Sequence, residues 1–364
     1  MSRPLTILFA GGGTGGHLYP AIAIAEEIQH IKPQTRFVFA GTKKKIEARV
    51  VPQKGYEFYP LWISGFHRRM KLRNILFPLK VIVSLLQSFF LIRKVKPQAV
   101  IGTGGYVCGP VLFAASFLGI PTAIHESNSF PGVTTRLLAG RVNKVFITFE
   151  ITKQWLKKTS TTELLGNPTR EILSSITRER ACAELQLSPA KKTLFAFGGS
   201  LGAQSINKAM PKIVSWAVEN DIQVIWQTGE SDWSSLPMVQ HHPNIKLMKY
   251  IEHMEFSYAA SDVVISRAGA TTLAELTRVG KPAILIPYPH AAANHQFLNA
   301  KTMVESGAAV LIDDKELDGK LLNTVQQLIS DDQALERMSE KSKELGRPNA
   351  GKEIAEKILS MIKN

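Results

Sequence analysis

Two glycine-rich loops, far apart in the chain, constrain its fold more than any other feature. The first, Gly11–His17, lies between the apolar run Thr6–Ala10 and a helix-like run, and the second, Gly198–Gln204, follows the apolar run Thr193–Phe197 in the same way. Glycines let backbone N–H groups approach a ligand closely, and the N-terminus of the following helix attracts an anion. Two such loops, heading two halves of one chain, predict two nucleotide-type domains that face one cleft.

The spacing of the apolar runs predicts an α/β fold. Strand-like runs alternate with helical stretches up to residue 150, and the pattern restarts at Lys192. This alternation predicts two Rossmann-like domains, each a parallel sheet with helices on both faces. We expect strands at Thr6–Ala10, Arg36–Ala40, Ala99–Gly102, Thr122–His125 and Lys144–Thr148, and again at Thr193–Phe197, Gln223–Gln227, Ile245–Lys249, Val263–Ser266, Ala283–Ile286 and Ala309–Leu311.

A turn-rich segment, Gly166–Arg170, separates the two blocks and is typical of a hinge between domains. The length of 364 residues, about twice that of a common domain, agrees with such a division. We therefore expect a first domain over residues 1–166 and a second over residues 167–348. The tail, residues 349–364, has apolar residues at helical spacing and predicts an amphipathic helix. One arrangement open to this helix is to pack back on the first domain.

Positive charge is concentrated in the first part of the chain. Residues 1–150 hold 19 Lys and Arg against 6 Asp and Glu, and the whole chain has a formal net charge of +14. No carboxylate side chain occurs between Glu57 and Glu126. This asymmetry indicates that the first domain has an anionic partner. The candidates are nucleic acid, an anionic membrane surface and a phosphorylated substrate.

The segment from Ile75 to Ile92 is apolar nearly all round and has basic residues on both sides. A helix buried on both sides is one interpretation, and a transmembrane span of borderline length, containing Pro78 and Lys80, is another. We favour a third, a monotopic patch that dips into one leaflet, because the basic flanks within residues 66–96 suit an anionic membrane surface. One apolar face of this helix carries Leu79, Ile82, Leu86 and Phe90.

The first glycine loop lacks the signatures of two common nucleotide sites. No Lys follows it, so it is not a Walker A loop, and the next strand ends in Phe39–Lys43 without the acidic residue that binds an NAD ribose. A phosphate cradle with His17 at its exit is the interpretation that remains. A neutral imidazole beside a reacting hydroxyl suits a general base near pH 7, although such a histidine is also a common capping residue.

Two further segments should end at the same edge of the first sheet. The glycine turn Gly102–Tyr106 follows one strand, and His125–Asn128 ends the next. Because ligands sit beyond the carboxyl ends of the strands in open α/β sheets, we expect these segments and the first loop to line one pocket. Glu126 is either an acceptor-binding group, together with His17 and Asn128, or a structural carboxylate that caps a loop, and we favour the former.

In the second half, a strand ends at Ser266, and the small residues that follow expose helix N–H groups to a diphosphate. Glu275, about one turn into the helix, is placed to accept hydrogen bonds from a ribose diol, or to interact with the positive end of the helix. Gln296 is a candidate for binding sugar hydroxyls or for capping a helix.

Three absences narrow the kinds of chemistry that the sequence predicts. The chain has no Asp-x-Asp pair and no His and Cys cluster with the spacing of metal ligands. Its two cysteines, Cys108 and Cys182, are isolated and form no C-x-x-C pair. We therefore expect no metal and no cofactor. The charge of a leaving diphosphate is then stabilised by helix dipoles, backbone amides and basic side chains.

Eight motifs occur in order at residues 12–17, 102–106, 125–128, 166–170, 198–203, 250–251, 267–275 and 294–296. With these motifs the chain resembles, over nearly its whole length, the MurG family of bacterial peptidoglycan N-acetylglucosaminyltransferases. The resemblance implies a GT-B arrangement of two Rossmann-like domains and an inverting transfer from UDP-N-acetylglucosamine. The implied acceptor is the polyprenyl-diphosphate lipid undecaprenyl-diphosphate-muramoyl-pentapeptide, lipid I, and the implied product is lipid II.

The resemblance also implies roles for single residues. His17 would be the catalytic base, and Asn128 would contact the sugar. From its position near His17, we also expect Glu126 to be catalytic and to help His17 take the proton from the acceptor C4 hydroxyl. Contacts to the donor sugar or the acceptor diphosphate would come from Thr14, Gly15 and Gly16. UDP-N-acetylglucosamine would be held by Arg170, Ser200, the backbone of Ile251, the segment Ala270, Thr271, Thr272, Leu273, Ala274 and Glu275, and Gln296.

The implied place of action is the cytoplasmic face of the bacterial inner membrane, for a peripheral protein with no nucleic acid partner. Two rival functions stay open. One is another GT-B enzyme, such as a lipid glycosyltransferase or a UDP-N-acetylglucosamine 2-epimerase, and the other is a non-catalytic nucleotide-binding membrane scaffold. An epimerase would have no use for the apolar patch, and a scaffold would have no use for His17 and Gln296 beside the loops.

Overall fold

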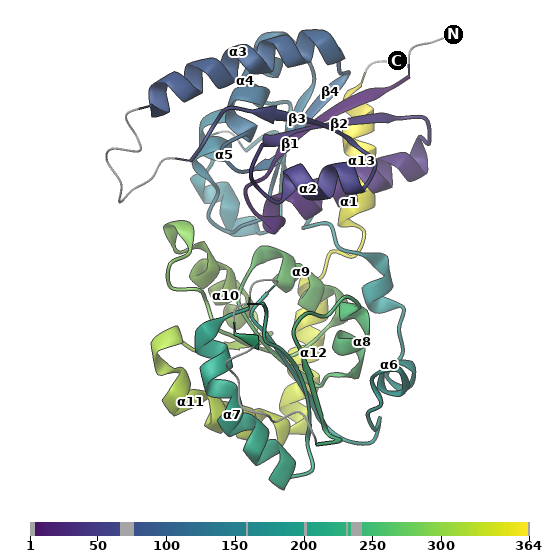
Figure 1. Ribbon diagram of the computed structural model, residues 1–364, viewed down its shortest axis with the longest axis vertical. Helices are drawn as coiled ribbons and strands as arrows, with labels where there is room; N and C mark the ends of the chain where they lie inside the picture. The colour runs from purple at the N-terminus through teal and green to yellow at the C-terminus, as the bar shows by residue number, and fades with distance from the viewer. Residues whose placement is uncertain are drawn as a thin grey trace. The chain divides into compact units, whose positions relative to one another are not determined.

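The structure is a computed structural model that describes residues 4–65, 76–157, 159–199, 202–230, 232–233 and 242–362. The chain forms two compact units, of which the first comprises Met1–Pro168 with Asn349–Asn364 and the second comprises Thr169–Pro348 (Figure 1). The turn-rich segment of the sequence predicts this boundary after residue 166, and the first unit ends at Pro168. Each unit is built on one parallel β-sheet, and the expected α/β fold is confirmed.

The first sheet has seven strands in the order β3-β2-β1-β4-β5-β6-β7. Their bounds are β1 Thr6–Gly11, β2 Arg36–Thr42, β3 Glu57–Leu61, β4 Ala99–Gly104, β5 Thr122–Glu126, β6 Lys144–Ile147 and β7 Thr162–Leu164. Strands β3 and β7 were not expected from the sequence. Both lie at the edges of the sheet, where β3 tolerates Pro60 and β7 has three residues, so neither has the long apolar run of a central strand.

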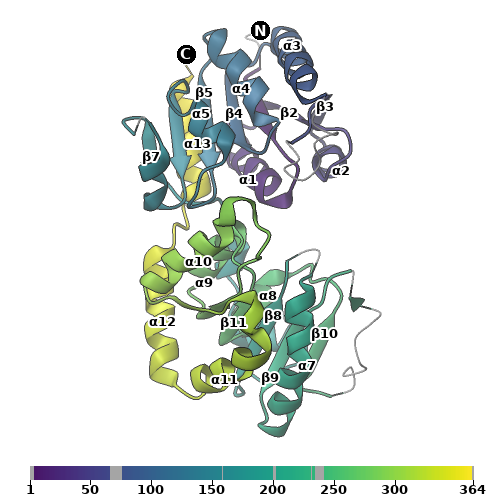
Figure 2. The same ribbon diagram turned by 90° about the vertical axis from the view of Figure 1, so that its left-hand side faces the viewer.

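Helices cover both faces of the first sheet because alternate residues of each strand point to opposite sides. On one side, Ile7 and Phe9 pack in a core with α1 (Gly15–Ile31), α2 (Glu47–Gln53) and α13 (Ala350–Met361). On the other side, Leu8 and Ala10 pack in a core with α3 (Phe77–Val95), α4 (Cys108–Phe117) and α5 (Val133–Leu138). Figure 2 shows α13, from the end of the chain, in the first unit, where it contacts α1.

The second sheet has six strands in the order β10-β9-β8-β11-β12-β13. The bounds are β8 Thr193–Phe197, β9 Gln223–Gln227, β10 Ile245–Met248, β11 Val263–Ser266, β12 Ala283–Leu285 and β13 Ala309–Leu311. The helices are α6 Arg178–Leu185, α7 Gln204–Glu219, α8 Met254–Ala260, α9 Ala270–Val279, α10 His295–Glu305, α11 Leu317–Ile329 and α12 Asp332–Leu345. In both sheets the strand order reverses direction beside the strand that leads into a glycine loop, which is β1 in the first and β8 in the second.

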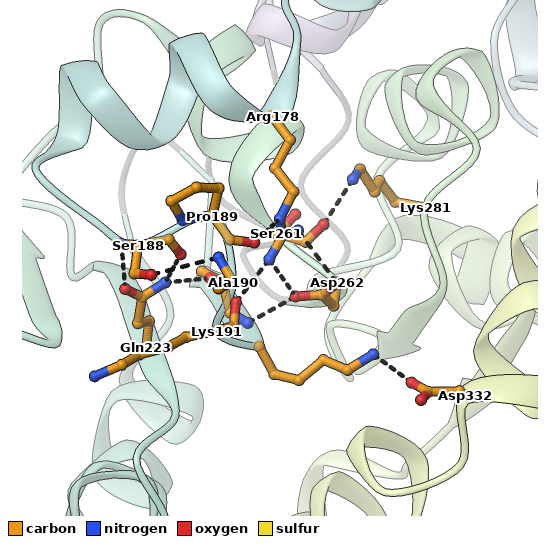
Figure 3. A network of polar contacts seen from close by, with 12 residues as sticks. Arg178, Ser188, Pro189, Ala190, Lys191, Gln223, Ser261, Asp262, Lys281 and Asp332 are labelled. Atoms are coloured by element: carbon orange, nitrogen blue, oxygen red, sulfur yellow. Dashed lines mark hydrogen bonds and ion pairs between the residues drawn. The ribbon is translucent and has the colours of Figure 1, made fainter.

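A polar network at the start of β8 and β11 joins α6 to the second sheet (Figure 3). The carboxylate of Asp262 accepts hydrogen bonds from Arg178 Nη2 at 3.0 Å and from the backbone N–H of Thr193 at 2.7 Å. Arg178 also donates to the carbonyl oxygen of Lys191 at 2.7 Å. Beside this network, Lys281 Nζ donates to the carbonyl oxygen of Ser261 at 2.6 Å. The network therefore ties helix, strands and connecting loops together at the edge opposite the second glycine loop.

Lys281 makes the stability of the protein depend on pH in the alkaline range. Burial lowers the pKa of its ammonium from 10.5 to about 8. Between these two values the unfolded chain binds a proton that the folded chain does not, so the free energy of unfolding rises with pH. We expect Lys281→Met to abolish this rise, which amounts to at most about 3 kcal/mol. Urea unfolding of both proteins at several pH values between 7 and 11 measures it, and a constant difference between them would contradict the prediction.

Candidate functional site

The first glycine loop connects β1 to α1 and lies directly against the turn that follows β4. A Cβ atom on Gly12 would lie 2.4 Å from Glu47 Cδ, and one on Gly105 would lie 2.5 Å from the carbonyl oxygen of Gly12. Gly105 also has a φ of +80°, which other residues rarely adopt. Glycine is therefore required at both positions, at Gly105 because the turn lies against the loop, and at Gly12 because the loop lies against the carboxylate of Glu47.

Glu47, which no motif of the sequence indicates, holds the shape of this loop. The side chain is 1% exposed. Its carboxylate accepts hydrogen bonds from the backbone N–H groups of Gly13 and Thr42, both at 2.9 Å, and from Thr42 Oγ1 at 2.7 Å. A carboxylate after the second strand, which would bind a ribose in a dinucleotide site, here binds the protein's own glycine loop.

His17 lies in the first turn of α1, between the loop and the turn after β4. Its carbonyl oxygen accepts a hydrogen bond from Thr103 Oγ1 at 2.7 Å. Its imidazole packs against Gly104, where a Cβ atom would lie 2.5 Å from His17 Nδ1. Since β1, β4 and β5 are neighbours in the sheet, the structure brings His17, the turn and the end of β5 to one edge.

The end of β5 carries two buried titratable side chains. Burial lowers the pKa of His125 to about 4, and its Nε2 lies 3.0 Å from the carbonyl oxygen of Gly166. His125 is therefore neutral at pH 7 and joins β5 to the end of the first unit. Glu126 is 4% exposed, and both of its carboxylate oxygens accept hydrogen bonds from its own loop. The donors are the backbone N–H and Nδ2 of Asn128, the backbone N–H of Gly132 and Thr135 Oγ1.

The N-terminus of α1 is open to an anion. Thr14 precedes the helix in an extended conformation and makes no capping hydrogen bond through its side chain. Thr14 and Gly16 are exposed, and Gly15 is half-buried. The helix dipole and these backbone N–H groups together favour a negatively charged group beside the loop.

The second glycine loop repeats this close packing. A Cβ atom on Gly198 would lie 2.2 Å from the backbone nitrogen of Ala203, and one on Gly202 would lie 2.1 Å from the carbonyl oxygen of Thr228. Gly202 also has a φ of +80°. Ser200, the residue of this loop that was expected to bind the nucleotide, lies outside the described residues.

A buried amide, Gln227, connects the second loop to Ile251 and was missed in the sequence analysis. Its Nε2 donates to the carbonyl oxygen of Gly199 at 3.0 Å, and its Oε1 accepts from the backbone N–H of Ile251 at 2.8 Å. The N–H of Ile251 is therefore engaged, and its carbonyl oxygen is the backbone group with which it would contact a ligand. A glutamine at the end of a strand matches no sequence motif, so the pattern offered no signal.

Helix α9 begins after Gly269, beside the second glycine loop. No side chain caps it, and within the described residues Ser266 Oγ and Thr271 Oγ1 are buried without a hydrogen-bond partner. Ala270 and Leu273 are buried, whereas the remaining residues of the expected segment, Thr271, Thr272, Ala274 and Glu275, are half-buried. Unpaired hydroxyl groups at an open helix N-terminus favour a polar, anionic ligand at this point.

Glu275 takes part in a cluster of charged and polar groups. Tyr258 Oη donates a hydrogen bond to Glu275 Oε2 at 2.9 Å. Arg170, about half exposed, lies 3.8 Å from the carboxylate of Glu255. Burial raises the pKa of Glu275, while Tyr258 and Arg170 act in the opposite direction. A carboxylate with one oxygen held in place still has the other oxygen for a ligand.

Gln296 stands in the first turn of α10, behind a loop with unusual backbone geometry. Ala293 and Asn294 have φ values of +53° and +56°. The amide oxygen of Gln296 accepts a hydrogen bond from the backbone N–H of Tyr288 at 2.9 Å, which anchors this loop. Its amide nitrogen is the group that would donate to a sugar hydroxyl.

Helix α3 presents an apolar face to the solvent. The side chains of Leu79, Ile82, Leu86 and Phe90 are 48–70% exposed. The residues that it buries against the rest of the unit include the small Ser84 and Ser88, both 0% exposed. The interpretation of a helix buried on both sides is therefore wrong. None of the helices among the described residues is long and apolar enough to cross a bilayer.

Comparison with known proteins identifies the family. The N-terminal domain of glycosyltransferase family 28 matches residues 7–147, and the C-terminal domain of the same family matches residues 193–354. A curated protein of Flavobacterium psychrophilum, named UDP-N-acetylglucosamine--N-acetylmuramyl-(pentapeptide) pyrophosphoryl-undecaprenol N-acetylglucosamine transferase, is 40% identical over 98% of each chain. The crystal structure of Acinetobacter baumannii MurG, with 26% identity, covers 98% of this chain and 100% of its own, with a TM-score of 0.77.

A solved UDP-N-acetylglucosamine 2-epimerase is also similar, with 16% identity, a TM-score of 0.65, and coverage of 99% of this chain and 96% of its own. That likeness shows the fold alone. Two parallel-sheet domains, each with a glycine loop at the strand where the order reverses, define a GT-B glycosyltransferase fold. The chain belongs to glycosyltransferase family 28.

Among the described residues, no group of three or more His, Cys, Asp or Glu side chains is arranged to hold a metal ion. The groups that these residues offer to a negatively charged ligand are backbone N–H groups at helix N-termini and basic side chains such as Arg170.

Proposed function

We propose that this protein transfers N-acetylglucosamine from UDP-N-acetylglucosamine to the C4 hydroxyl of undecaprenyl-diphosphate-N-acetylmuramoyl-pentapeptide, which converts lipid I into lipid II. The observation that carries this proposal is the 40% identity, over 98% of each chain, to a relative named for this transfer. The geometry supports it, because each unit has an open helix N-terminus beside a tightly packed glycine loop, as two diphosphate-bearing substrates require.

The second unit would bind the donor. Its diphosphate would lie at the N-terminus of α9, near the loop of Gly199 and Ser200, with Arg170 as the neighbouring cation. The ribose diol would donate to Glu275, the backbone of Ile251 would contact the nucleotide, and the sugar hydroxyls would contact Gln296. Charge that develops on the departing UDP is then stabilised by preorganised dipoles rather than by a metal.

The first unit would bind the acceptor and supply the base. Thr14, Gly15 and Gly16 would receive the acceptor diphosphate or the donor sugar, and Asn128 would contact the sugar. The acceptor C4 oxygen attacks the anomeric carbon, the bond from that carbon to UDP breaks with inversion, and the hydroxyl proton passes to His17. The four hydrogen bonds to Glu126 favour its use in holding Asn128 and the loop in place.

The exposed face of α3 would hold the protein at an anionic membrane surface, on the cytoplasmic side of the inner membrane where the lipid acceptor resides. Its apolar side chains are flanked among the described residues by Lys80, Arg93, Lys94 and Lys96. The basic residues between 66 and 75 lie outside the described residues. Each Lys or Arg near an anionic leaflet contributes about 1 kcal/mol to binding.

The rival functions fit this structure less well. A 2-epimerase has the same fold but no lipid acceptor, so it gives no reason for the four large apolar side chains exposed on α3. A non-catalytic scaffold gives no reason for a histidine packed against the turn after β4, beside an open helix N-terminus.

Transfer itself tests the proposal. Purified protein is incubated with radiolabelled UDP-N-acetylglucosamine and a lipid I analogue, and the product is identified by mass and anomeric configuration. We expect a β-linked disaccharide lipid and UDP. Conversion of the donor into its C2 epimer, UDP-N-acetylmannosamine, without lipid product would favour an epimerase, and nucleotide binding without turnover would favour a scaffold.

A further inference from the structure

We infer that Tyr258 is a positioning residue for nucleotide recognition, because its hydroxyl holds one oxygen of Glu275 and so orients the other toward the ribose hydroxyls. This inference rests on the proposed role of Glu275 at the donor ribose. The two residues come from different helices, since Tyr258 lies in α8 and Glu275 in α9. Their contact therefore fixes the carboxylate of Glu275 relative to a second helix, and not only relative to the helix that carries it.

The ring of Tyr258 has little freedom to move. It is 0% exposed and packs edge-on against two rings of β8, Phe195 at 5.5 Å and Phe197 at 6.1 Å between ring centroids. Strand β8 leads directly into the second glycine loop. The packing on β8 therefore fixes the position of the hydroxyl that contacts Glu275 at 2.9 Å. The same strand positions the glycine loop for the diphosphate.

The charges around Glu275 show what the hydroxyl contributes. Burial is the largest influence and raises the pKa of the Glu275 carboxyl, and the nearby Glu255 of α8 raises it further. The hydrogen bond from Tyr258 and the positive charge of Arg170 lower it. Burial also raises the pKa of Tyr258 well above its ordinary value, so the phenol keeps its proton. Tyr258 therefore remains a donor that favours the ionised carboxylate, which is the form that accepts from hydroxyl groups.

The preference of the protein for a nucleotide with a 2′-hydroxyl distinguishes two roles of Tyr258, the positioning of Glu275 and simple support of the fold. A site built to hydrogen-bond a hydroxyl group rejects a ligand that lacks it, because a buried polar group is then left unpaired. If Tyr258 orients Glu275, its removal reduces the preference for UDP over 2′-deoxy-UDP. If Tyr258 merely supports the fold, its removal weakens the binding of both nucleotides to the same extent.

The test is Tyr258→Phe, which removes one oxygen and keeps the ring. We expect calorimetry to show about a tenfold loss of UDP affinity, a loss of less than about twofold for 2′-deoxy-UDP, and so a smaller ratio between the two. The acid limb of UDP binding should also move to higher pH, since Glu275 loses a group that keeps it ionised. Ser257→Ala, at the adjacent buried position of α8, is the matched control and should leave the ratio unchanged.

A double-mutant cycle with Glu275→Gln completes the experiment, and thermal melting verifies that every variant is folded. In the Glu275→Gln protein, Tyr258→Phe should have little further effect on the ratio. Equal losses for both nucleotides in Tyr258→Phe, or an undiminished effect in the Glu275→Gln protein, would overturn the inference. A wild-type protein that binds UDP without preferring it to 2′-deoxy-UDP would overturn the inference but leave the proposed transfer standing. Failure of the wild type to bind UDP at all would overturn both.

Discussion

Replacing His17 by alanine is expected to lower kcat for transfer by about 100- to 10,000-fold, the contribution that general-base catalysis typically makes. Affinity for UDP should be nearly unchanged, because the proposed nucleotide contacts belong to the second unit. The wild-type kcat should fall on the acid side of its pH profile, since a protonated imidazole cannot accept the hydroxyl proton. Steady-state kinetics with a lipid I analogue and calorimetry with UDP provide the two measurements.

His30→Ala is the matched control for this experiment. His30 is exposed near the other end of the same helix, α1, and we expect its replacement to leave kcat unchanged. A His17→Ala protein that keeps more than about a tenth of the wild-type kcat would reduce His17 to a positioning residue. Glu126 would then be the next candidate base, although removing it would also release the loop that carries Asn128.

Replacing Leu79, Ile82, Leu86 and Phe90 together by serine is expected to lower binding to anionic vesicles by at least about 100-fold. Each of these side chains buries apolar area in the membrane interface worth about 1 kcal/mol or more. Because all four are already 48–70% exposed, their replacement should cost the fold little stability and should leave UDP binding intact. Vesicle co-sedimentation at several salt concentrations measures the effect, and binding of the wild type should weaken as salt increases.

A control with the same chemistry changes exposed apolar residues outside α3, namely Ile31, Ile172 and Val304. Their replacement by serine should leave vesicle binding as it is in the wild type. Equal loss of binding in both sets of variants would show that α3 is not a specific membrane surface. Vesicle binding that persists without the four α3 side chains would have the same meaning.

Sequence patterns predicted the central strands because those strands are buried on both faces and are therefore continuously apolar. The edges were harder to predict. Strand β3 contains Pro60 and is half-exposed, and β7 has three residues, so neither produces a distinct pattern. For α3 the composition left three interpretations open. The structure excludes the helix buried on both sides, because Leu79, Ile82, Leu86 and Phe90 are exposed on one face, while Ser84, Ser88 and the C-terminal residues Leu91, Ile92 and Val95 are buried on the other.

The parts of the candidate site that belong to glycine loops could be predicted, since a loop between a strand and a helix is a local feature. The groups that hold those loops could not. Glu47, Gln227 and Tyr258 each act on residues that are distant in sequence or lie on another element. No spacing rule connects a carboxylate in one helix to the glycine loop of another βα unit. Such contacts follow from the packed fold and become visible once the strands are paired.

The return of α13 to the first unit affects the order in which the protein is completed during synthesis. Ile354, Ala355 and Ile358 are fully buried and belong to the same core as β1 and α1, yet they are translated after all of Thr169–Pro348. The second unit is continuous in sequence and is available to fold as soon as it has left the ribosome. The first unit, although begun earlier, keeps an uncovered apolar surface on α1 until the last helix emerges. In the growing chain, the domain that is started first is therefore the one that is finished last.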